Sequence, residues 1–512
     1  MADKIIAYDL GTGGNKASLY DREGTCLGST FQPYETLYPG SGRHEQRPMD
    51  WWNSVVTSTR QLLAVTNIDP QEIACLAISG HSLGVVPVDK GGNLLRETTP
   101  IWSDSRAGKQ AKEFFKRTDE KNWYLTTGNG FPAKLYSVFK ILWYQDNEPE
   151  VFNEIAKVIG TKDYINFKLT GQLRTDYSYA SGSGVYDLKG WDYSAELLEV
   201  SGLNPDIFPE IVPSSEIIGQ LTPSAAEALG LPESVKVAAG GVDNSCMALG
   251  ARNTAPGRLY MSLGSSAWIA VSAEEPVLDA ESRPFVFTHV MPGMFTSAVS
   301  IFSAGNSLRW LRDNLFLDLV EEAIRSERDV YDLLTALAET SPVGANKLLF
   351  NPSLAGGSSQ EPSAEIRGAF SGLDLGHTRA DLVRAGLEGI ALNLGVVLQI
   401  LKRFTSLSDE MVIVGGGSKS QLWRQIVADV FDMRIIKTNI GDDAGSLGAA
   451  ALAAVGSGIW KDYSKIDGIH HIEDVREPIP AHVSSYLKLI EPFEMLRQSQ
   501  AQIASDLNQI DL

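Results

Sequence analysis

Two short hairpin motifs, half a chain apart, constrain the fold of this chain most. The first has its turn at Gly11-Thr12-Gly13 and the second at Gly264-Ser265-Ser266, each between two apolar runs. Both patterns predict a strand, a tight turn and a second strand, and such turns can bring backbone N–H groups close to a phosphate. The first turn fits neither the Walker loop nor the dinucleotide fingerprint, because Lys16 stands where the third glycine of the fingerprint belongs. A different kind of phosphate site is therefore implied, with one hairpin from each half of the chain.

The size and charge of the chain limit its class. At 512 residues it exceeds the size at which one core stops growing, so we expect two domains, at 1–248 and 249–512. The formal net charge of −19 disfavours nucleic acid and anionic membranes as partners. Three widely separated cysteines argue against a disulfide framework or a zinc site. Without a signal peptide or a run of about 18 apolar residues, we expect a cytoplasmic protein.

The hydrophobic periodicity predicts an α/β protein. We expect strands at 73–78, 85–88, 235–239 and 411–414, and helices at 104–117, 133–144, 244–251, 381–403 and 420–431. The strand at 235–239 would deliver Gly240-Gly241-Val242-Asp243 at its carboxyl end, where α/β folds collect the groups that contact ligands. A stretch at 351–363, rich in Gly, Ser and Pro, is expected to be a long loop.

Six segments, taken in order along nearly the whole chain, resemble the FGGY family of carbohydrate kinases, and the xylulokinase branch is the most similar. They are Asp9–Lys16, Trp102–Arg106, Lys140–Trp143 ahead of Glu148-Pro149, Gly240–Asn244, Ser262–Ser266 and Gly416–Gln425 with Ala428-Asp429. The resemblance implies two actin-like (ribonuclease H-like) ATPase domains that flank an active-site cleft. It also implies ATP and Mg²⁺ as cofactors, a sugar as the small-molecule partner, and leaves a homodimer open as the oligomeric state.

The reaction implied by the resemblance is phosphorylation of a primary hydroxyl of a small ketose, D-xylulose to D-xylulose 5-phosphate. Another pentulose, a tetrulose or a polyol, such as ribulose, erythritol or glycerol, is the alternative substrate. The resemblance assigns the catalytic base to Asp243, and a strand-end carboxylate among glycines suits the removal of a hydroxyl proton. The alternative role of Asp243 is to cap a helix that starts at Asn244.

Asp9 ends a strand beside the first phosphate turn. Mg²⁺ prefers one or two carboxylates together with waters, so Asp9 and Asp243 are the expected metal ligands, directly or through water. The alternative for Asp9 is that it closes the turn by binding its own backbone. Lys16 can touch a phosphate, or it can be a solvated lysine at a hairpin edge.

The nucleotide site is expected to combine the two turns with Gly415-Gly416-Gly417-Ser418, which lies between a predicted strand and a predicted helix. Glycines there would let the backbone lie flat against a purine or ribose, although a structural bend is the alternative. The expected nucleotide-binding residues are Gly11, Thr12, Gly13, Lys16, Gly264, Ser265, Ser266, Gly416, Gly417, Ser418, Ser420 and Gln421.

The sugar site is expected in the loop after the 73–78 strand and in the Trp-x-Asp-x-Arg segment of the family. Its expected residues are His81, Ser82, Leu83, Trp102, Asp104, Arg106, Asp243 and Asn244. Leu83 departs from the family, in which xylulokinases commonly carry Gln-Met-His-Gly and glycerol kinases an Arg-Glu pair. Since leucine cannot hydrogen-bond a hydroxyl, the sequence predicts a broader choice of sugar than in ordinary xylulokinases.

Two further classes of protein were weighed against a kinase. Gly80-His81-Ser82-Leu83-Gly84 fits the nucleophile elbow of serine hydrolases, but an elbow must lead into a helix, whereas 85–88 is expected to be a strand. A catalytically silent sugar-binding relative would usually lose a carboxylate, and both Asp9 and Asp243 are present.

Overall fold

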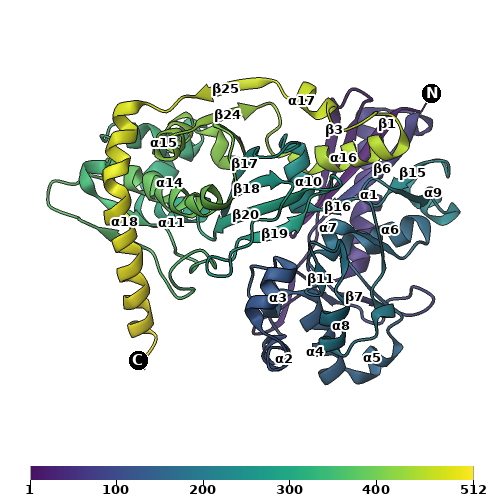
Figure 1. The fold of residues 1–512 in the computed structure, drawn as a ribbon. Coiled ribbons are helices and arrows are strands. Elements are labelled where there is room, and N and C mark those ends of the chain that lie inside the picture. Colours follow the sequence, from purple (N-terminus) through teal and green to yellow (C-terminus); the bar gives the residue numbers. More distant parts are fainter. Residues whose placement is uncertain (1, 511–512) are drawn as a thin grey trace. The chain divides into compact units, whose positions relative to one another are not determined.

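The computed structural model describes residues 2–510, which divide into two compact units (Figure 1). Among the described residues, unit 1 comprises 2–254, 272–296 and 443–470, and unit 2 comprises 255–271, 297–442 and 471–510. The units therefore do not follow chain order as the expected division between residues 248 and 249 does. In particular, the segment 443–470 joins unit 1 because its helix α16 (Ala444–Ser457) packs on β1, β6 and α10 of that unit.

Unit 1 is built on a seven-stranded sheet. Its order is β14-β15-β6-β1-β2-β3, and β16 also pairs with β6. The strands are β1 (Lys4–Leu10), β2 (Gly14–Tyr20), β3 (Cys26–Pro33), β6 (Ile73–Gly80), β14 (Ile217–Gln220), β15 (Lys236–Ala238) and β16 (Gly241–Val242). The predicted first hairpin is confirmed as the antiparallel pair β1 and β2. β1, β15 and β16 all run parallel to β6, so their carboxyl ends share one edge.

The two faces of this sheet are covered by different helices, because side chains alternate along a strand. The Tyr8 hydroxyl meets Thr59 of α1 (Pro48–Thr66) at 2.7 Å, and the face of Ile6, Tyr8 and Leu10 forms the main core of the unit with α1 and α6 (Thr161–Thr170). Asp9 faces the other way, towards α16, and a Cβ added at Gly445 would lie 3.1 Å from its carboxylate. Only a small residue fits there.

The rest of unit 1 forms short sheets and helices around a second, aromatic core that includes Phe114, Trp123, Tyr136 and Phe139. Its strands are β4 (Leu37–Gly40), β5 (Arg43–Gln46), β7 (Val86–Val88), β8 (Thr99–Pro100), β9 (Lys157–Ile159), β10 (Arg174–Asp176), β11 (Tyr186–Asp187), β12 (Asp192–Tyr193), β13 (Glu210–Val212) and β19 (Phe285–Thr288). Its other helices are α2 (Gly108–Phe114), α3 (Glu120–Thr127), α4 (Ser137–Asn147), α5 (Pro149–Glu154), α7 (Tyr177–Ala180), α8 (Ala195–Ser201), α9 (Pro223–Leu229), α10 (Asp243–Gly250) and α17 (Lys465–Ile469).

The strands of unit 2 include six of the second seven-stranded sheet, in the order β20-β18-β17-β23-β24-β25. These strands are β17 (Leu259–Leu263), β18 (Ala267–Ala273), β20 (Phe295–Ile301), β23 (Glu410–Val414), β24 (Arg434–Thr438) and β25 (Ile472–Arg476), and a small pair is formed by β21 (Leu349–Asn351) and β22 (Ala369–Ser371). The helices are α11 (Gly305–Leu315), α12 (Leu317–Ser326), α13 (Val330–Glu339), α14 (Arg379–Phe404), α15 (Gln421–Phe431) and α18 (Pro480–Leu507). The predicted second hairpin is confirmed as β17 and β18.

Helix α14 is the one helix among residues 2–510 that is long and apolar enough to cross a membrane. Most of it is buried inside unit 2, where it packs on α13, α15 and β21, as a core helix does. The expected helices at 381–403 and 420–431 correspond to α14 and α15. The expected helix at 104–117 is shorter, since α2 begins at Gly108, and α4 begins at Ser137 after a short 3₁₀ turn at Ala133–Leu135.

Candidate active site

Three parallel strand ends place the expected catalytic groups side by side in unit 1. In the sheet register Asp9 of β1 pairs with Ser79 of β6, and Gly241 of β16 pairs with the same Ser79 on its other side. The residues that follow β6 begin at His81, and Asp243 follows β16 directly. Asp9, His81 and Asp243 therefore meet at one edge of the sheet, at the carboxyl ends of its parallel strands, where α/β folds bind ligands.

Asp9 is held at this edge by its neighbour in the sheet. The Ser79 hydroxyl donates to Asp9 Oδ1 at 2.8 Å. Burial raises the pKa of the Asp9 carboxyl, while the Ser79 hydrogen bond and the Lys16 charge oppose that rise. The hydrogen-bond partner of the carboxylate is a side chain of β6, so the alternative in which Asp9 closes the β1–β2 turn finds no support among its contacts.

Asp243 is the first residue of α10. The helix is capped by Val242, and the Asn244 N–H donates to Asp243 Oδ1 at 2.7 Å. Burial, followed by the negative charge of Asp9, raises the pKa of Asp243 to about 7. A carboxylate with a raised pKa accepts a proton more readily, as a general base must.

The first hairpin turn is tied down on one side and open on the other. The Trp102 indole donates from Nε1 to Thr12 Oγ1 at 2.9 Å, and Gln46 Nε2 donates to the Thr12 carbonyl at 2.7 Å. Gly13 is exposed, and no atom lies within 4 Å of the place that a Cβ would take. Backbone at this turn can therefore approach a ligand closely.

Lys16 is neither free nor simply solvated at the edge of the hairpin. Its ammonium group forms an ion pair with Asp443, the N-cap residue of α16. The pair fixes the start of α16 against β2. Both side chains are partly exposed, so a bound anion could still compete for Lys16.

The loop after β6 brings His81, Ser82 and Leu83 to the same edge. Burial lowers the pKa of His81 to about 4, so the ring is neutral, and it lies 3.2 Å from the Thr161 hydroxyl and edge-on to Trp51. Leu83 has a positive φ of 60°, and its side chain is 1% exposed within the aromatic core. The burial of Leu83 favours a packing role, although its expected contact with the sugar stays a prediction.

The loop also excludes the serine hydrolase alternative. Its residues lead from β6 into the strand β7, whereas a nucleophile elbow leads into a helix.

Asp104 and Arg106 neutralise each other instead of facing outward as separate charges. Arg106 donates to both oxygens of Asp104, at 2.8 Å from Nε and 2.7 Å from Nη2, and it also pairs with Glu45. The guanidinium lies over the Trp143 ring at 4.8 Å. The Asp104 carboxylate further accepts from the His44 backbone N–H at 2.7 Å. This network holds the loop that carries Trp102, which is 38% exposed and so open to a ligand.

Lys140 belongs to this site and was not among the expected residues. Its side chain is fully buried, and Nζ donates to the Leu83 carbonyl at 3.0 Å and to the Ile101 carbonyl at 2.7 Å. The lysine thus joins the His81 loop to the Trp102 loop. Burial lowers the pKa of Lys140 to about 7. The signal for it was a single lysine inside the apolar run 138–143, where a charge is costly without partners.

Unit 2 contains a separate cavity of about 620 Å³. Five of the expected nucleotide-binding residues line it, namely Gly264, Ser265, Gly416, Gly417 and Ser420. Ser266, Ser418 and Gln421 are not among the lining residues; Ser420 caps α15 by accepting from the Trp423 N–H at 3.2 Å. The volume lies in the range of pockets that bind small molecules and cofactors, about 300–1,000 Å³.

Close backbone packing shapes this cavity. The Gly305 N–H donates to the Gly264 carbonyl at 2.9 Å, which places the start of α11 on the second hairpin turn. Gly415 has a φ of 87°, and a Cβ added at Gly417 would lie 2.5 Å from the Leu263 side chain. No atom lies within 4 Å of a Cβ added at Gly416, so the cavity has room at this glycine.

The other wall of the cavity comes from further residues, of which Lys419 and Trp423 alone lie in one of the family-like segments. They lie on α11, just before and along α13, and at the start of α15, and comprise Leu308, Arg309, Asp329, Tyr331, Asp332, Thr335, Lys419 and Trp423. Nothing in the sequence links 308–335 to 416–423, because they come together only through the packing of α13 near α14 and α15.

The carboxylates of unit 1 fit a hard divalent cation. Asp9 and Asp243 offer oxygen donors at one sheet edge. Burial raises the pKa of both carboxyls, and the charge of Asp9 raises that of Asp243 further, a cost that a cation beside them would relieve. Within residues 2–510 no cluster of three or more His, Cys, Asp or Glu side chains suits a metal ion. A site of two carboxylates completed by waters and substrate phosphates is the kind that Mg²⁺ uses.

Comparison with known proteins places this geometry in a family. The models for the N-terminal and C-terminal domains of the FGGY family of carbohydrate kinases match residues 4–250 and 259–457. Xylulose kinase from Bacillus subtilis (strain 168) is 30% identical over 89% of this chain and 88% of its own length, and gluconokinase from the same organism is 27% identical over 98% of each. The solved structure of ligand-bound xylulose kinase from Lactobacillus acidophilus has a TM-score of 0.90 and 26% identity, over 98% of this chain and 99% of that one. The chain is a sugar kinase that belongs to the FGGY family of carbohydrate kinases, with the actin-like ATPase fold of that family.

Proposed function

We propose that this enzyme transfers the γ-phosphoryl group of ATP to a primary hydroxyl of D-xylulose, giving D-xylulose 5-phosphate. The observation that carries the proposal is the placement of Asp9 and Asp243 at the carboxyl ends of β1 and β16, the two strands that flank β6 in unit 1. Xylulose kinases are among the most similar relatives in both sequence and structure.

Asp243 acts in this proposal as the general base. Its carboxylate accepts the proton of the attacking hydroxyl as the O–P bond forms, and loss of such a base typically costs about 10²–10⁴ in rate. Asp9 and Asp243 would hold Mg²⁺, which when bound neutralises charge on the transferred phosphoryl group. The backbone N–H groups of the Gly11–Gly13 and Gly264–Ser266 turns bind phosphate oxygens, and the unit 2 cavity takes the adenosine.

The charges around the sugar loops favour a neutral sugar over a sugar acid. His81 is neutral, and Arg106 is compensated by Asp104 and Glu45. A gluconate carboxylate would therefore find no uncompensated cation at His81 or Arg106, and the Lys140 ammonium is buried and bound to two carbonyl oxygens. The Trp102 face and the neutral His81 ring suit hydroxyls and C–H surfaces. This reasoning ranks xylulose above gluconate, the sugar named for one relative.

The substrate is tested by a panel of sugars with ATP consumption as the readout. D-xylulose should give the highest kcat/KM, above D-ribulose, erythrulose, erythritol, glycerol and gluconate. The phosphorylated carbon of the product should be read by ³¹P–¹H NMR. A higher kcat/KM for gluconate would overturn the choice of substrate while leaving a sugar kinase in place.

The role of Asp243 is tested by Asp243→Asn. Turnover with D-xylulose should fall by at least about 10²-fold while ATP binding and the melting temperature are retained. Asp192→Asn is a matched control, because Asp192 Oδ1 also accepts the N–H of the next residue at 2.7 Å but is exposed and outside the site. An Asp243→Asn enzyme with more than about a tenth of wild-type turnover would remove Asp243 from the mechanism.

We also infer a cytoplasmic location and retain the homodimer as a prediction. Cys26, Cys75 and Cys246 are all unpaired, and free thiols are typical of a reducing compartment. Fractionation of cells and sedimentation of the purified enzyme would test these two statements.

A further inference from the structure

We propose that Ser178, fixed by the buried Lys162–Asp176 ion pair, is a positioning residue that sets the place of Asp243. The inference rests on the proposed role of Asp243 as the base and names the device that orients it. The device lies in unit 1, where α6, α7 and the 239–242 segment meet, and nothing in the local sequence pattern around Ser178 predicts it.

The device starts from three charges that are fully buried. Lys162 Nζ lies 2.9 Å from Asp176 Oδ1 and 2.5 Å from Asp163 Oδ1, and none of the three side chains is exposed. Asp163 is held in turn by the Thr175 hydroxyl at 2.8 Å and the Gly160 N–H at 3.2 Å. Buried ion pairs are often no more stabilising than apolar side chains of the same volume, so stability alone does not account for them.

Ser178 connects this charged group to the catalytic segment. Its hydroxyl donates to Asp176 Oδ2 at 2.5 Å and accepts the Val242 N–H at 2.9 Å. Because the Asp176 carboxylate can only accept, the hydroxyl hydrogen must point at it, and a lone pair of Ser178 is left facing Val242. Val242 is the N-cap of α10 and immediately precedes Asp243.

The residues before Val242 are fixed by the same elements. The Ala239 carbonyl accepts from Lys162 Nζ at 3.3 Å and from Asn166 Nδ2 at 2.8 Å. Gly240 has a φ of 72°, and a Cβ there would lie 2.2 Å from the Ile78 carbonyl, so this residue must be glycine. The backbone that leads into Asp243 is thus held by α6 at Ala239 and by α7 at Val242.

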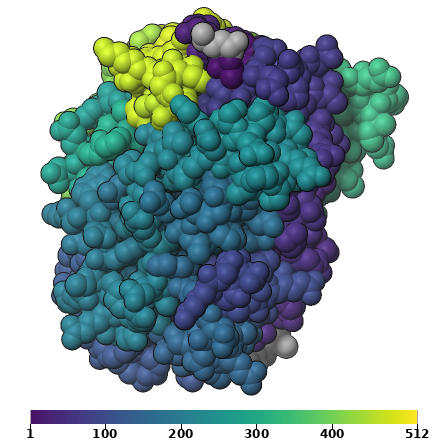
Figure 2. Space-filling view, turned by 90° about the vertical axis from the view of Figure 1, so that its right-hand side faces the viewer, coloured from purple at the N-terminus to yellow at the C-terminus, as the bar shows by residue number. Residues whose placement is uncertain are grey.

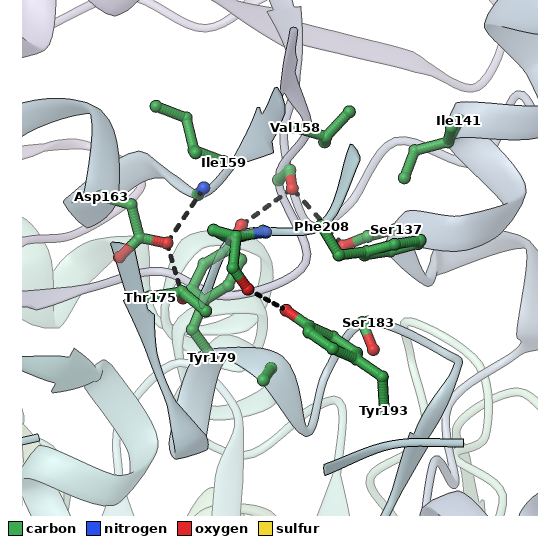
Figure 3. Close-up of a pocket in the computed structure, with 14 residues that line it drawn as sticks. Ser137, Ile141, Val158, Ile159, Asp163, Thr175, Tyr179, Ser183, Tyr193 and Phe208 are labelled. Atoms are coloured by element: carbon green, nitrogen blue, oxygen red, sulfur yellow. Dashed lines mark hydrogen bonds between the residues drawn. The ribbon is translucent and has the colours of Figure 1, made fainter. Parts of the chain in front are cut away.

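The cavity next to this network does not suit a substrate. Figure 3 shows Asp163, Thr175 and Tyr179 along its wall, with the Asp163 carboxylate bound to Thr175. Its volume is about 20 Å³, enough for about one water molecule and far too small for a sugar. The buried charges therefore act on the protein's own backbone.

The test compares two serines that bind the same carboxylate oxygen. Ser178→Ala removes the acceptor of the Val242 N–H. Ser214→Ala is the matched control, since the Ser214 hydroxyl also donates to Asp176 Oδ2, at 2.7 Å, whereas the Val242 N–H donates to Ser178 and not to Ser214. The Ser214 main-chain carbonyl, which accepts from the Gly240 N–H, is unchanged by that substitution.

We expect Ser178→Ala to lower kcat about 10- to 100-fold, because a displacement of about 1 Å at a reacting group can cost 10²-fold. The KM values for sugar and ATP should stay within about twofold of the wild type, since neither binding surface is changed. Ser214→Ala should lower the melting temperature by about as much as Ser178→Ala does, and should keep kcat within about twofold of the wild type. Equal kcat values for the two variants, or a loss confined to KM, would overturn the inference.

A second pair keeps the test valid if Ser178→Ala does not fold. Threonine and valine have side chains of the same shape, and only threonine has a hydroxyl. The kcat of Ser178→Thr should therefore be at least about tenfold higher than that of Ser178→Val. Equal kcat in this pair would contradict the inference. Failure of the proposed role of Asp243 can be told apart from failure of the Ser178 inference. If Asp243 is not the base, Asp243→Asn retains turnover. If Asp243→Asn is inactive and Ser178→Ala has a normal kcat, only the positioning role of Ser178 is refuted.

Discussion

Leu83 combines a backbone conformation that leucine rarely adopts with a fully buried side chain. A Cβ added at Gly182 would lie 2.8 Å from Leu83 Cδ2, so the leucine is also tightly packed. From the sequence, the departure from the family at this position suggested a lost hydrogen bond to the sugar. The packing indicates instead that the Leu83 side chain anchors the loop. The Leu83 carbonyl, which accepts from Lys140, then serves the site by holding the loop in place.

We therefore expect Leu83→His to act on stability rather than on substrate choice. Placing a polar ring in an apolar cluster should lower the free energy of unfolding by about 2 kcal/mol or more, whereas Leu83→Met, which conserves volume, should cost less than about 1.5 kcal/mol. The ratio of kcat/KM between D-xylulose and its analogues should change less than about twofold. A shift of that ratio by tenfold in favour of D-xylulose would restore the sugar-binding role.

Lys140 gives a second prediction for a single residue. Lys140→Met would leave the Leu83 and Ile101 carbonyls without their donor and loosen the two loops of the sugar site. We expect the KM for D-xylulose to rise at least about tenfold while the KM for ATP is unchanged. Lys140→Arg, which keeps a donor, should recover part of the affinity; equal KM values for sugar in all three enzymes would show that Lys140 only fills space.

At the scale of elements, the closest packing in unit 1 is between α10 and α16. A Cβ added at Gly448 would lie 1.9 Å from the Cys246 carbonyl, and one added at Gly250 would lie 1.9 Å from the Ala444 carbonyl. The small residues of α16 allow this close packing, and its partner is α10. Because α10 begins with Asp243 and α16 covers Asp9, the contact between these helices places both carboxylates.

Gly448→Ala should accordingly push α10 and α16 apart. We expect a loss of about 1–3 kcal/mol in stability and at least a tenfold loss of kcat, since overpacking forces backbone shifts. Gly468→Ala on α17 is a control, because no atom lies within 4 Å of its added Cβ. Circular dichroism melting and initial rates would measure both; a Gly448→Ala enzyme indistinguishable from the Gly468→Ala control would contradict this view of the helix pair.

At the scale of the whole molecule, the family match spans both halves of the chain, while unit 1 draws on three separate stretches of it. The burial of His81 and His289 in this unit affects its response to acid. Burial lowers the pKa of each ring to about 4, below its ordinary value of 6.5. Between pH 6.5 and 4 the unfolded chain therefore binds more protons at these sites than the folded protein does.

The free energy of unfolding therefore falls as the pH is lowered through this range. Stability that these neutral rings contribute is present above pH 6.5 and is lost as the pH falls towards 4. His289→Asn, which keeps an acceptor near the place of Nδ1 for the Met291 N–H, should lose less melting temperature over this range than the wild type. Calorimetry at pH 7.0 and 4.5 gives the comparison, and other titrating groups cancel because they are common to both proteins. Parallel losses in the two proteins would show that His289 does not carry the acid response.

The sequence by itself determined the two hairpins, the strand at 235–239, which is β15, and the glycine-rich turn at 415–417, whereas the separate strand β16 that leads into Asp243 was not predicted. These features depend on local periodicity and on residues, such as glycine, whose conformational range is their own property. For the same reason five of the expected nucleotide-binding residues line the unit 2 cavity.

Only the tertiary structure decided which distant residues serve the site. It placed 443–470 in unit 1, paired Lys16 with Asp443, joined Lys140 to two loops and set Ser178 against Val242. It also showed that Asp104 and Arg106, both expected in the sugar site, form an ion pair with each other. The contacts of Lys16, Lys140 and Ser178 are not encoded by spacing along the chain, because each depends on how helices and strands far apart in sequence pack around a shared core.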